Sequence, residues 1–137
     1  MSARAALATL LGTDAQLLML GFTQSDVYGP NAIDTPSRDK YFIVIRWEEV
    51  PRTIRGNGPD IVTVWVHAPK ELIRDYGLID TTISRVKEIL EAAEHVQGSD
   101  GWSLTEASYN GASGDLFDDG YNSLCRWIRF RCACREI

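Results

Sequence analysis

The sequence contains few of the residues that most often carry out catalysis or bind metals. Among its 137 residues are two histidines, and its three cysteines (Cys125, Cys132 and Cys134) all fall within the last 13 positions. An odd number of cysteines without framework spacing excludes a disulfide scaffold and predicts free thiols made in a reducing cytoplasm. Zinc sites usually place a cysteine pair around a two-residue loop, so the Cys132-x-Cys134 pair on one predicted strand favours small buried thiols over a metal site.

Long apolar runs and an excess of basic charge are also missing. No uninterrupted apolar stretch approaches the roughly 18 to 20 residues that span a bilayer. Asp14 and Gln16 interrupt the Ala- and Leu-rich N-terminal segment, so we expect no membrane span and no signal peptide. The 14 basic and 19 acidic residues give a net charge of −5, which argues against a dedicated DNA-binding module. With 45% hydrophobic and 24% charged residues, we expect one soluble globular domain over residues 1–137.

Catalytic and ligand-binding signatures are absent from the sequence as well. It has no Gly-x-Ser-x-Gly turn, and His67 on a predicted strand is interpreted as a satisfied residue of a sheet surface. Gly56 and Gly58 lack the further glycine and the Lys-Ser/Thr pair of phosphate-binding loops, and the aspartates of residues 114–120 (GDLFDDG) lack the spacing of a calcium loop. We therefore predict no catalytic residue, no cofactor and no metal, and a protein that is not an enzyme.

Two segments have the apolar spacing of helices. Leucines and alanines recur at helical spacing over residues 6–18, with a break at residues 12–14 that predicts a helix followed by a second short helical turn. The longer pattern starts at Asp80, interpreted as an N-cap, and ends near Gly98, which places His95 in the last turn. This second segment is the best helix in the sequence.

Four segments have the composition or alternation of strands. They are residues 41–50, 61–67, 102–109 and 121–136, and residues 26–28 could form a further short strand. Residues 51–59 (PRTIRGNGP) are too long for a two-residue turn, which predicts a hairpin with a projecting loop. The sequence therefore predicts an α+β fold. Its four-stranded, mainly antiparallel sheet would have an N-terminal helix and one long central helix packed on one face, together with a long hairpin loop.

The last predicted strand has two chemically different faces. Its even positions supply apolar side chains for the core, whereas its odd positions are mostly basic with one large aromatic residue: Cys125, Trp127, Arg129, Arg131 and Arg135. Arginine and tryptophan together could stack on nucleic acid bases and contact phosphates, in a patch formed by Arg126, Arg129, Arg131 and Arg135 with Trp127. They are also the residues most often found at protein interface hot spots, and the acidic charge of the chain favours that use.

The order of several segments resembles that of the tail terminator proteins of actinobacterial siphophages. The segments are VYGPNAIDTP, YFIVIRWEE, IVTVWVHAP, DYGLIDTTISRVKEIL, GSDGW and DDGYNSLCRWIRFR, and the resemblance covers nearly the full chain. These elements are structural rather than catalytic.

The resemblance implies a lambda-like terminator fold and a hexameric ring of copies that sits on the last ring of the major tail tube protein. Such a ring stops tube polymerisation and presents a docking face to the head-tail connector or stopper proteins, while genomic DNA passes through the lumen without specific binding. The protein would assemble in the host cytoplasm and reside in the virion, at the head-proximal end of the tail. A ring closed by one repeated contact requires two different patches on each copy.

Three groups of residues are candidates for contacts between subunits or with the tube. Exposed apolar groups in loops are costly unless they dock, and strand-borne Trp and Arg suit an interface. The candidates are Arg52, Ile54 and Arg55 in the hairpin loop, Leu116 and Phe117 in the acidic loop, and Trp127, Arg129 and Arg131 on the last strand. For Leu116 and Phe117, the alternative is that both fold back onto their own core.

Two other functions stay open at this point. A head-completion or stopper protein of the neck would share small size, acidity and ring formation. A small cytoplasmic ligand-binding domain would instead be a monomer or dimer with a polar cleft and a strongly perturbed titratable group.

Overall fold

The computed structural model describes residues 3–28, 40–48, 60–73 and 75–136. Its helices are α1 (Arg4–Gly12), α2 (Ala15–Met19) and α3 (Gly77–Glu91), with one 3-10 turn, η1 (Gln24–Asp26). Its strands are β1 (Val27–Tyr28), β2 (Phe42–Glu48), β3 (Asp60–Pro69), β4 (Val96–Gln97), β5 (Trp102–Ala112), β6 (Leu116–Asp118) and β7 (Ser123–Glu136). All four predicted strands are present with small shifts at their ends, and β1 is the further short strand.

The strands form one seven-stranded sheet rather than the predicted four-stranded one. Their order is β1-β2-β3-β7-β5-β4, and β6 also pairs with β7. The β1–β2 pair is parallel and the remaining pairs are antiparallel. The predicted strand number is wrong because β1, β4 and β6 have only two or three residues each, which is too short for an alternating pattern. Each of them forms by pairing with a longer strand.

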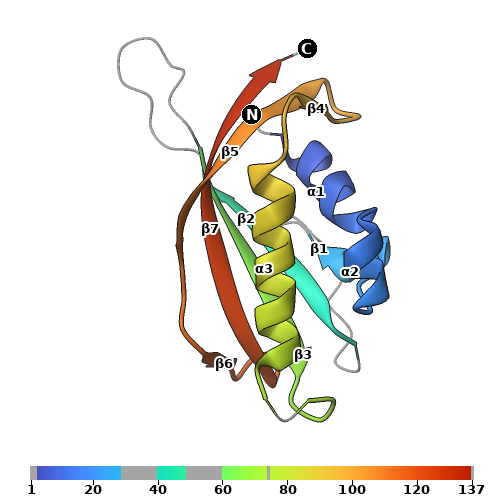
Figure 1. Cartoon of the computed structure of the whole chain (residues 1–137), viewed down its shortest axis with the longest axis vertical. Helices are drawn as coiled ribbons and strands as arrows, with labels where there is room; N and C mark the ends of the chain where they lie inside the picture. Colours follow the sequence, from blue (N-terminus) through green and yellow to red (C-terminus); the bar gives the residue numbers. More distant parts are fainter. Residues whose placement is uncertain (1–2, 29–39, 49–59, 74, 137) are drawn as a thin grey trace.

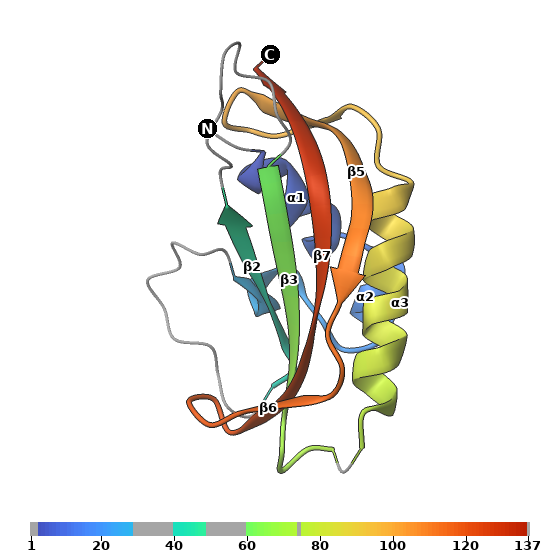
Figure 2. The ribbon, with the colours of Figure 1, turned by 90° about the vertical axis from the view of Figure 1, so that its left-hand side faces the viewer.

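The helices cover one face of the sheet and leave the other open. In Figure 1, α1, α2 and α3 lie on the same side of the sheet formed by β2, β3, β7 and β5. Figure 2 looks onto the opposite face, where these four strands lie side by side in front of α1 and α2. Within the described parts of the chain, no helix crosses this second face. We call it the open face.

The core lies between the helices and the covered face of the sheet. Strand side chains that point toward the helices alternate with side chains of the open face, as expected for a sheet with one buried side. The buried residues of this layer include Ile43, Ile45, Val62, Val64, Val66, Ile128, Phe130 and Cys132 from the strands and Leu7, Leu11, Val86 and Leu90 from the helices. On β7 the predicted core face is confirmed, with Leu124 and Cys134 only partly buried against this layer.

Asp14 separates α1 from α2, where the sequence predicts the helix break. Its side chain accepts a hydrogen bond from the backbone N–H of Leu17 at 3.0 Å and so caps α2. The same carboxylate accepts hydrogen bonds from Arg85 of α3 at 2.7 and 3.0 Å. Asp14 therefore sets both the start of α2 and its position beside α3.

The long helix α3 begins three residues before the predicted N-cap. Asp75 accepts a hydrogen bond from the backbone N–H of Gly77 at 2.9 Å, at the start of the helix. Asp80 lies inside the first turn, and its carboxylate forms an ion pair with Arg126 of β7 at 2.6 Å. The predicted N-cap role of Asp80 is wrong, because this side chain reaches across to the sheet.

The predicted end of this helix is also wrong. α3 ends at Glu91, and His95 lies beyond it with a φ of 51°, where its backbone N–H donates to the carbonyl oxygen of Thr105 at 3.2 Å. Gly98 lies in the β4–β5 connection, where an added Cβ would stand 2.8 Å from the backbone nitrogen of Ala6. This glycine marks a close approach to α1 rather than a helix end.

Candidate assembly interface

The open face of β2, β3 and β7 carries aligned rows of aromatic and basic side chains. The strand register places Val44, Trp65 and Trp127 in one row. In the next row the same register places Arg46, Thr63 and Arg129, and in the following one Glu48, Ile61 and Arg131. We call these three rows the Trp/Arg surface. They contain three of the predicted interface residues, Trp127, Arg129 and Arg131, together with Trp65 and Arg46 from neighbouring strands.

The aromatic and basic groups of the Trp/Arg surface contact one another. The rings of Trp65 and Trp127 lie 6.5 Å apart between centroids, and the Arg129 guanidinium lies 4.5 Å from the centre of the Trp127 ring. Arg129 also donates a long hydrogen bond of 3.4 Å from Nε to the Thr63 hydroxyl. A guanidinium over an indole face is a favourable cation–π pair. These contacts hold the surface in a defined arrangement.

Positive charge on this surface is only partly neutralised. Arg46 forms an ion pair with Glu48 at 3.3 Å. Among the residues that the structure describes, Arg129 and Arg131 form no ion pair with a carboxylate. A sheet face with two half-buried tryptophans and two guanidinium groups that have no carboxylate partner among the described residues has the composition of an interface core.

A compact aromatic cluster occupies the end of the open face near the start of β7. His67 stacks on Phe42 with ring centroids 4.6 Å apart, and Tyr121 lies edge-on to both rings at 5.2 Å. Cys125 pairs in register with His67, on the same face of β7 as Trp127, and is buried, as the interpretation of the cysteines as small buried thiols predicts.

His67 is a buried residue with a structural hydrogen bond. Its Nδ1 lies 2.8 Å from the hydroxyl of Ser123, which has no exposed surface, and His67 itself is 2% exposed. Burial lowers the pKa of His67 from 6.5 to about 4, partly opposed by the negative charge of Asp118. A serine beside a histidine is the contact that nucleophilic catalysis uses, but a hydroxyl without exposed surface cannot reach a substrate. The contact therefore stabilises the fold.

Beside this cluster the open face has a shallow hollow of about 240 Å³. Its lining joins the aromatic cluster to the Trp/Arg surface, and consists of Val44, Arg46, Trp65, His67, Asp118 and Tyr121. Small-molecule sites usually measure about 300 to 1,000 Å³ and enclose their ligand. The hollow is therefore better suited to a single side chain of a partner protein than to a cofactor.

Leu116 and Phe117, predicted as interface residues, lie on β6 at the edge of the open face. Leu116 is 37% exposed and Phe117 is 46% exposed. Leu116 pairs in register with Cys125, and the Lys70 ammonium lies 5.8 Å from the centre of the Phe117 ring. Both side chains keep substantial contact with solvent instead of folding into the core. The remaining candidates, Arg52, Ile54 and Arg55, lie outside the described residues.

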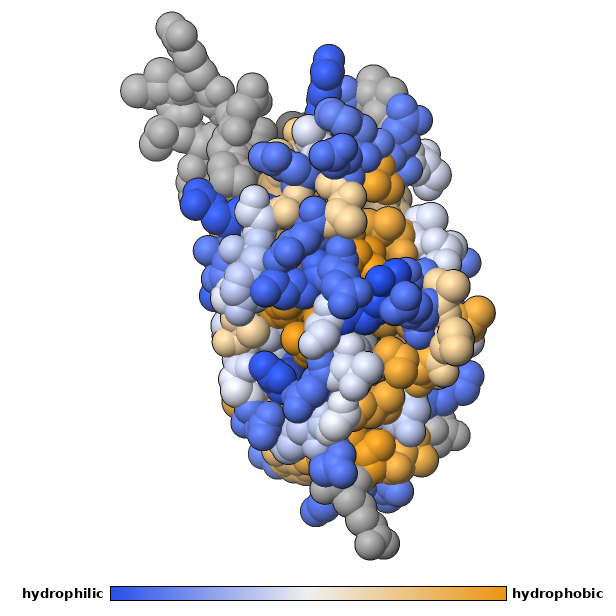
Figure 3. Space-filling model, viewed as in Figure 1, coloured by the Kyte–Doolittle hydropathy of each residue, from blue (hydrophilic) through white to orange (hydrophobic). Residues whose placement is uncertain are grey.

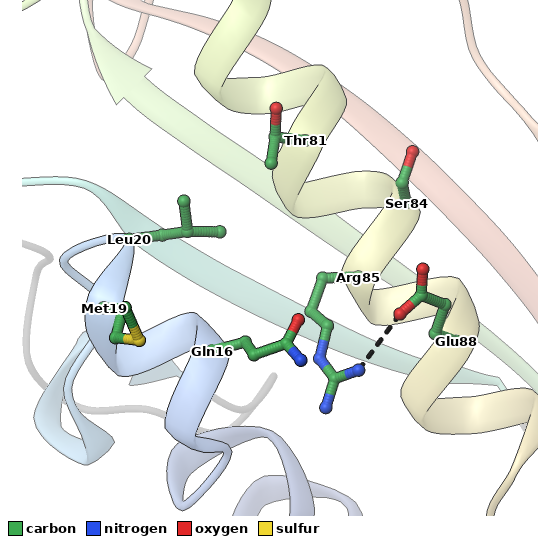
Figure 4. Close-up of a pocket in the computed structure, with 7 residues that line it drawn as sticks. All are labelled: Gln16, Met19, Leu20, Thr81, Ser84, Arg85 and Glu88. Atoms are coloured by element: carbon green, nitrogen blue, oxygen red, sulfur yellow. Dashed lines mark hydrogen bonds and ion pairs between the residues drawn. The ribbon is translucent and has the colours of Figure 1, made fainter.

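A second exposed apolar surface lies on the helix side of the molecule. Leu18 is 58% exposed and Met19 is 87% exposed. A groove of about 650 Å³ runs between α2 and α3 next to them, lined by Gln16, Met19, Leu20, Thr81, Ser84, Arg85 and Glu88. We call it the α2/α3 groove. Figure 3 shows apolar surface gathered on this side of α3, and Figure 4 shows the residues that line the groove.

Charged groups close one end of the α2/α3 groove. Arg85 lies between two carboxylates, with ion pairs of 2.7 Å to Asp14 and 3.0 Å to Glu88. The hydrogen bond from Arg85 holds the pKa of Asp14 below its ordinary value of 3.8. Leu20 and Thr81 face each other at the other end, as Figure 4 shows. The groove therefore has an apolar end and a charged end.

The predictions from the sequence do not include this groove, although the sequence contains a signal for it. Residues 17–20 (LLML) are four consecutive apolar residues, of which the first three end the five-residue helix α2 and the fourth is its C-cap. A helix packed on one side cannot bury apolar groups that point in all directions. Of these four side chains only Leu17 is buried, so exposed apolar surface follows from the run itself.

The described residues offer no group of three or more metal-ligating side chains. Cys125 and Cys132 are buried thiols, and burial raises the pKa of Cys125 to about 11 and that of Cys132 to about 12. Both thiols are therefore protonated and weakly nucleophilic near neutral pH. In the part of the chain that the structure describes, no helix is long and apolar enough to span a bilayer.

Comparison with known proteins identifies structural neighbours only. No protein-family model matches the chain, and no curated protein matches it. A chain from the virion of a native gene transfer agent (GTA) particle superposes with a TM-score of 0.70 at 15% identity, over 95% of this chain and 92% of that one. A second solved structure superposes with a TM-score of 0.54 at 12% identity, over 92% of this chain and 99% of that one. At these identities the likeness establishes a shared fold, a mixed α+β arrangement that extends over nearly the whole length of this chain.

Proposed function

We propose that this protein is a structural component of a phage-like virion, and specifically a tail terminator. Copies of the chain would form a hexameric ring on the last ring of the major tail tube protein and end tube polymerisation. The head-proximal face of the ring would bind connector or stopper proteins. Genomic DNA would pass through the lumen without specific binding.

The Trp/Arg surface carries this proposal. Two tryptophans, and two guanidinium groups that form no ion pair with a described carboxylate, stand on a sheet face that no described helix covers. A monomeric protein gains nothing from that composition, whereas a protein interface uses it for affinity and specificity. The structural neighbour in a gene transfer agent virion supports the same class of protein, because that chain also belongs to a phage-like particle.

The groups that could react are buried or protonated, which favours a structural role over catalysis. Ser123 is fully buried beside His67, and burial disfavours the thiolate forms of Cys125 and Cys132. A small ligand-binding domain would need an enclosed polar cleft, whereas the α2/α3 groove is an open surface with an apolar end. We therefore propose that the protein has no enzymatic activity.

A head-completion or stopper protein of the neck is the second candidate. It would also form a ring within the virion, and the neighbour in the gene transfer agent particle supports either position equally. The two functions differ in the partner they bind. A terminator binds the tail tube, whereas a neck protein binds the portal.

The test is tube growth in the presence of the protein. The purified chain would be added to the major tail tube protein of the same genome under polymerising conditions, and tube lengths and ends would be measured by negative-stain microscopy. The terminator function predicts shorter tubes with an extra ring at one end. Tubes that stay bare and keep their length would contradict it, and binding to the portal alone would assign the protein to the neck.

A further inference from the structure

The α2/α3 groove and the Trp/Arg surface lie on opposite sides of the molecule and differ in chemistry. The groove lies between α2 and α3 on the helix side, and the Trp/Arg surface belongs to the open face of the sheet. Figures 1 and 2 show that the helices and the open face are on opposite sides of the sheet. We propose that the α2/α3 groove of one copy receives the Trp/Arg surface of a second copy. This inference rests on the proposed ring, and names the two patches that form its repeated contact.

The apolar parts of the two surfaces are complementary. Met19 is 87% exposed and Leu20 lines the groove beside it, whereas Trp65 and Trp127 stand together on the open face. Thioether and aliphatic groups pack well against aromatic rings. Covering Met19 with an indole ring removes apolar surface of both copies from water. In the free chain the apolar surface of Met19 stays in contact with water.

The charged parts of the two surfaces are opposite in sign. At the groove, Asp14 and Glu88 share the single cation Arg85, so this cluster keeps one net negative charge. On the Trp/Arg surface, Arg131 is exposed and forms no ion pair with any described carboxylate. Glu88 is the accessible member of the acidic cluster, with 65% of its side chain exposed. We therefore pair Glu88 of one copy with Arg131 of the next.

The apolar and charged parts are also separated by similar distances on the two surfaces. Arg131 follows Trp127 by four residues on β7, a distance of about 13 Å along a strand. Glu88 follows Thr81 by seven residues on α3, a distance of about 10 Å along a helix. Thr81 marks the apolar end of the groove beside Leu20, so Trp127 and Arg131 can meet the two ends at once.

The contact joins two different surfaces, and this difference determines whether the copies form a dimer or a ring. Each copy in an open chain keeps one groove and one Trp/Arg surface free, and a closed ring satisfies all of them. An interface in which both copies used the same patch would stop at a dimer. The arrangement therefore supplies the two unlike patches that a ring requires.

Charge exchange across the contact tests the pairing. Glu88→Arg and Arg131→Glu, made separately, should each weaken self-association at least about tenfold, because each places like charges opposite one another. An equimolar mixture of the two variants should restore assembly, since every groove then meets a surface of opposite charge. The double variant Glu88→Arg/Arg131→Glu should assemble as well as the wild type. Sedimentation velocity and negative-stain microscopy measure the result.

Matched variants separate this contact from effects on folding. Glu94→Arg makes the same charge change at an exposed residue outside the groove and should leave assembly unchanged. Met19→Asp tests the apolar end at a side chain that the fold hardly buries, and should weaken assembly without lowering the thermal unfolding midpoint.

The outcomes distinguish this inference from the proposed function. If the wild type forms rings and both single variants form them equally well, or if the mixture fails to recover, the pairing is wrong and the terminator function stands. If Arg131→Glu loses retention of short duplex DNA while rings persist, the Trp/Arg surface binds nucleic acid and the pairing is wrong. If the wild type forms no ring in solution or on tubes, the proposed function and the pairing both fail.

Discussion

Single residues on the open face have roles that their position in the sequence conceals. His67 shares the open face of β3 with the half-buried Trp65, yet it is buried because Phe42 and Tyr121 enclose its ring. The sequence predicts a satisfied histidine on a sheet surface. The hydrogen bond is present, to Ser123, 56 residues later in the chain, but the side chain is buried. Contacts between residues this far apart depend on strand order, which the sequence pattern does not determine.

The burial of His67 predicts that stability falls as the pH is lowered from about 6.5 to about 4. The unfolded chain binds a proton on this ring near pH 6.5, whereas the folded chain binds one only near pH 4. Between these values the unfolded state holds more protons, so acidification favours unfolding by up to about 3 kcal/mol. Urea denaturation at a series of pH values measures this loss.

Two variants show whether His67 is the source of this pH dependence. His67→Phe keeps an aromatic ring against Phe42 but cannot be protonated, so its unfolding free energy should change much less between pH 6.5 and 4. His95→Gln, a change at an exposed histidine, should keep the wild-type dependence. A full wild-type loss of stability in His67→Phe would contradict this explanation.

Among the interface candidates, the sequence identifies residues on one strand better than their neighbours across the sheet. Alternation along the last strand places Trp127, Arg129 and Arg131 on one face, as the structure does. Trp65 and Arg46 join them only through the strand register. Registers between strands depend on the packing of the whole sheet, so the sequence predicts the residues of β7 but not the width of the surface.

At the scale of elements, long patterns are predicted well and short ones poorly. The α1–α2 break and the long strands β2, β3, β5 and β7 follow from periodicity in the sequence. The strands β4 and β6 have two and three residues, and exist because β5 and β7 offer hydrogen-bonding partners. Helix α3 differs at both ends because the residues that resemble caps, Asp80 and Gly98, make tertiary contacts instead.

The position of α2 depends on the two hydrogen-bonding roles of Asp14. This carboxylate caps α2 through Leu17 and binds Arg85 of α3. Asp14→Ala loses both interactions and should lower the free energy of unfolding by about 2 to 3 kcal/mol. Asp14→Ser keeps a capping oxygen and should lose only about half as much. Chemical denaturation of both variants measures the difference.

The difference in stability between the two Asp14 variants separates the contribution of helix capping from that of the bond to Arg85. Equal losses for Asp14→Ala and Asp14→Ser would mean that capping contributes nothing and that the bond to Arg85 accounts for the whole effect. A wild-type stability for both would contradict the role of Asp14 in joining α2 to α3. Because the α2/α3 groove lies between these helices, both variants should also weaken self-association.

At the scale of the whole molecule, charge is distributed unevenly. The net charge of −5 conceals a basic surface on the open face and an acidic cluster at the groove on the helix side. Composition alone argues against nucleic acid binding, but it does not reveal that unlike charges lie on opposite sides of one chain. That separation makes head-to-tail association of copies favourable.

The fold class and the covered face of the sheet are predictable from the sequence, whereas the open face is only partly so. Helices with one apolar stripe and strands with one apolar side require a common core, and this requirement fixes the layers. Nothing comparable fixes the side chains that remain in contact with solvent in the free chain, such as Trp65 and Trp127 on the open face and Met19 on the helix side. In the proposed ring a second copy covers them, and a single sequence does not specify that contact.

The mass of the purified protein in solution tests the central claim most directly. Light scattering coupled to size-exclusion chromatography, repeated over a range of micromolar concentrations, gives the number of copies in the assembly. We predict a closed species of six copies that appears as a ring in negative stain. A protein that stays monomeric at every concentration, and also in the presence of tail tubes, would contradict the proposal that this chain is a ring-forming tail terminator.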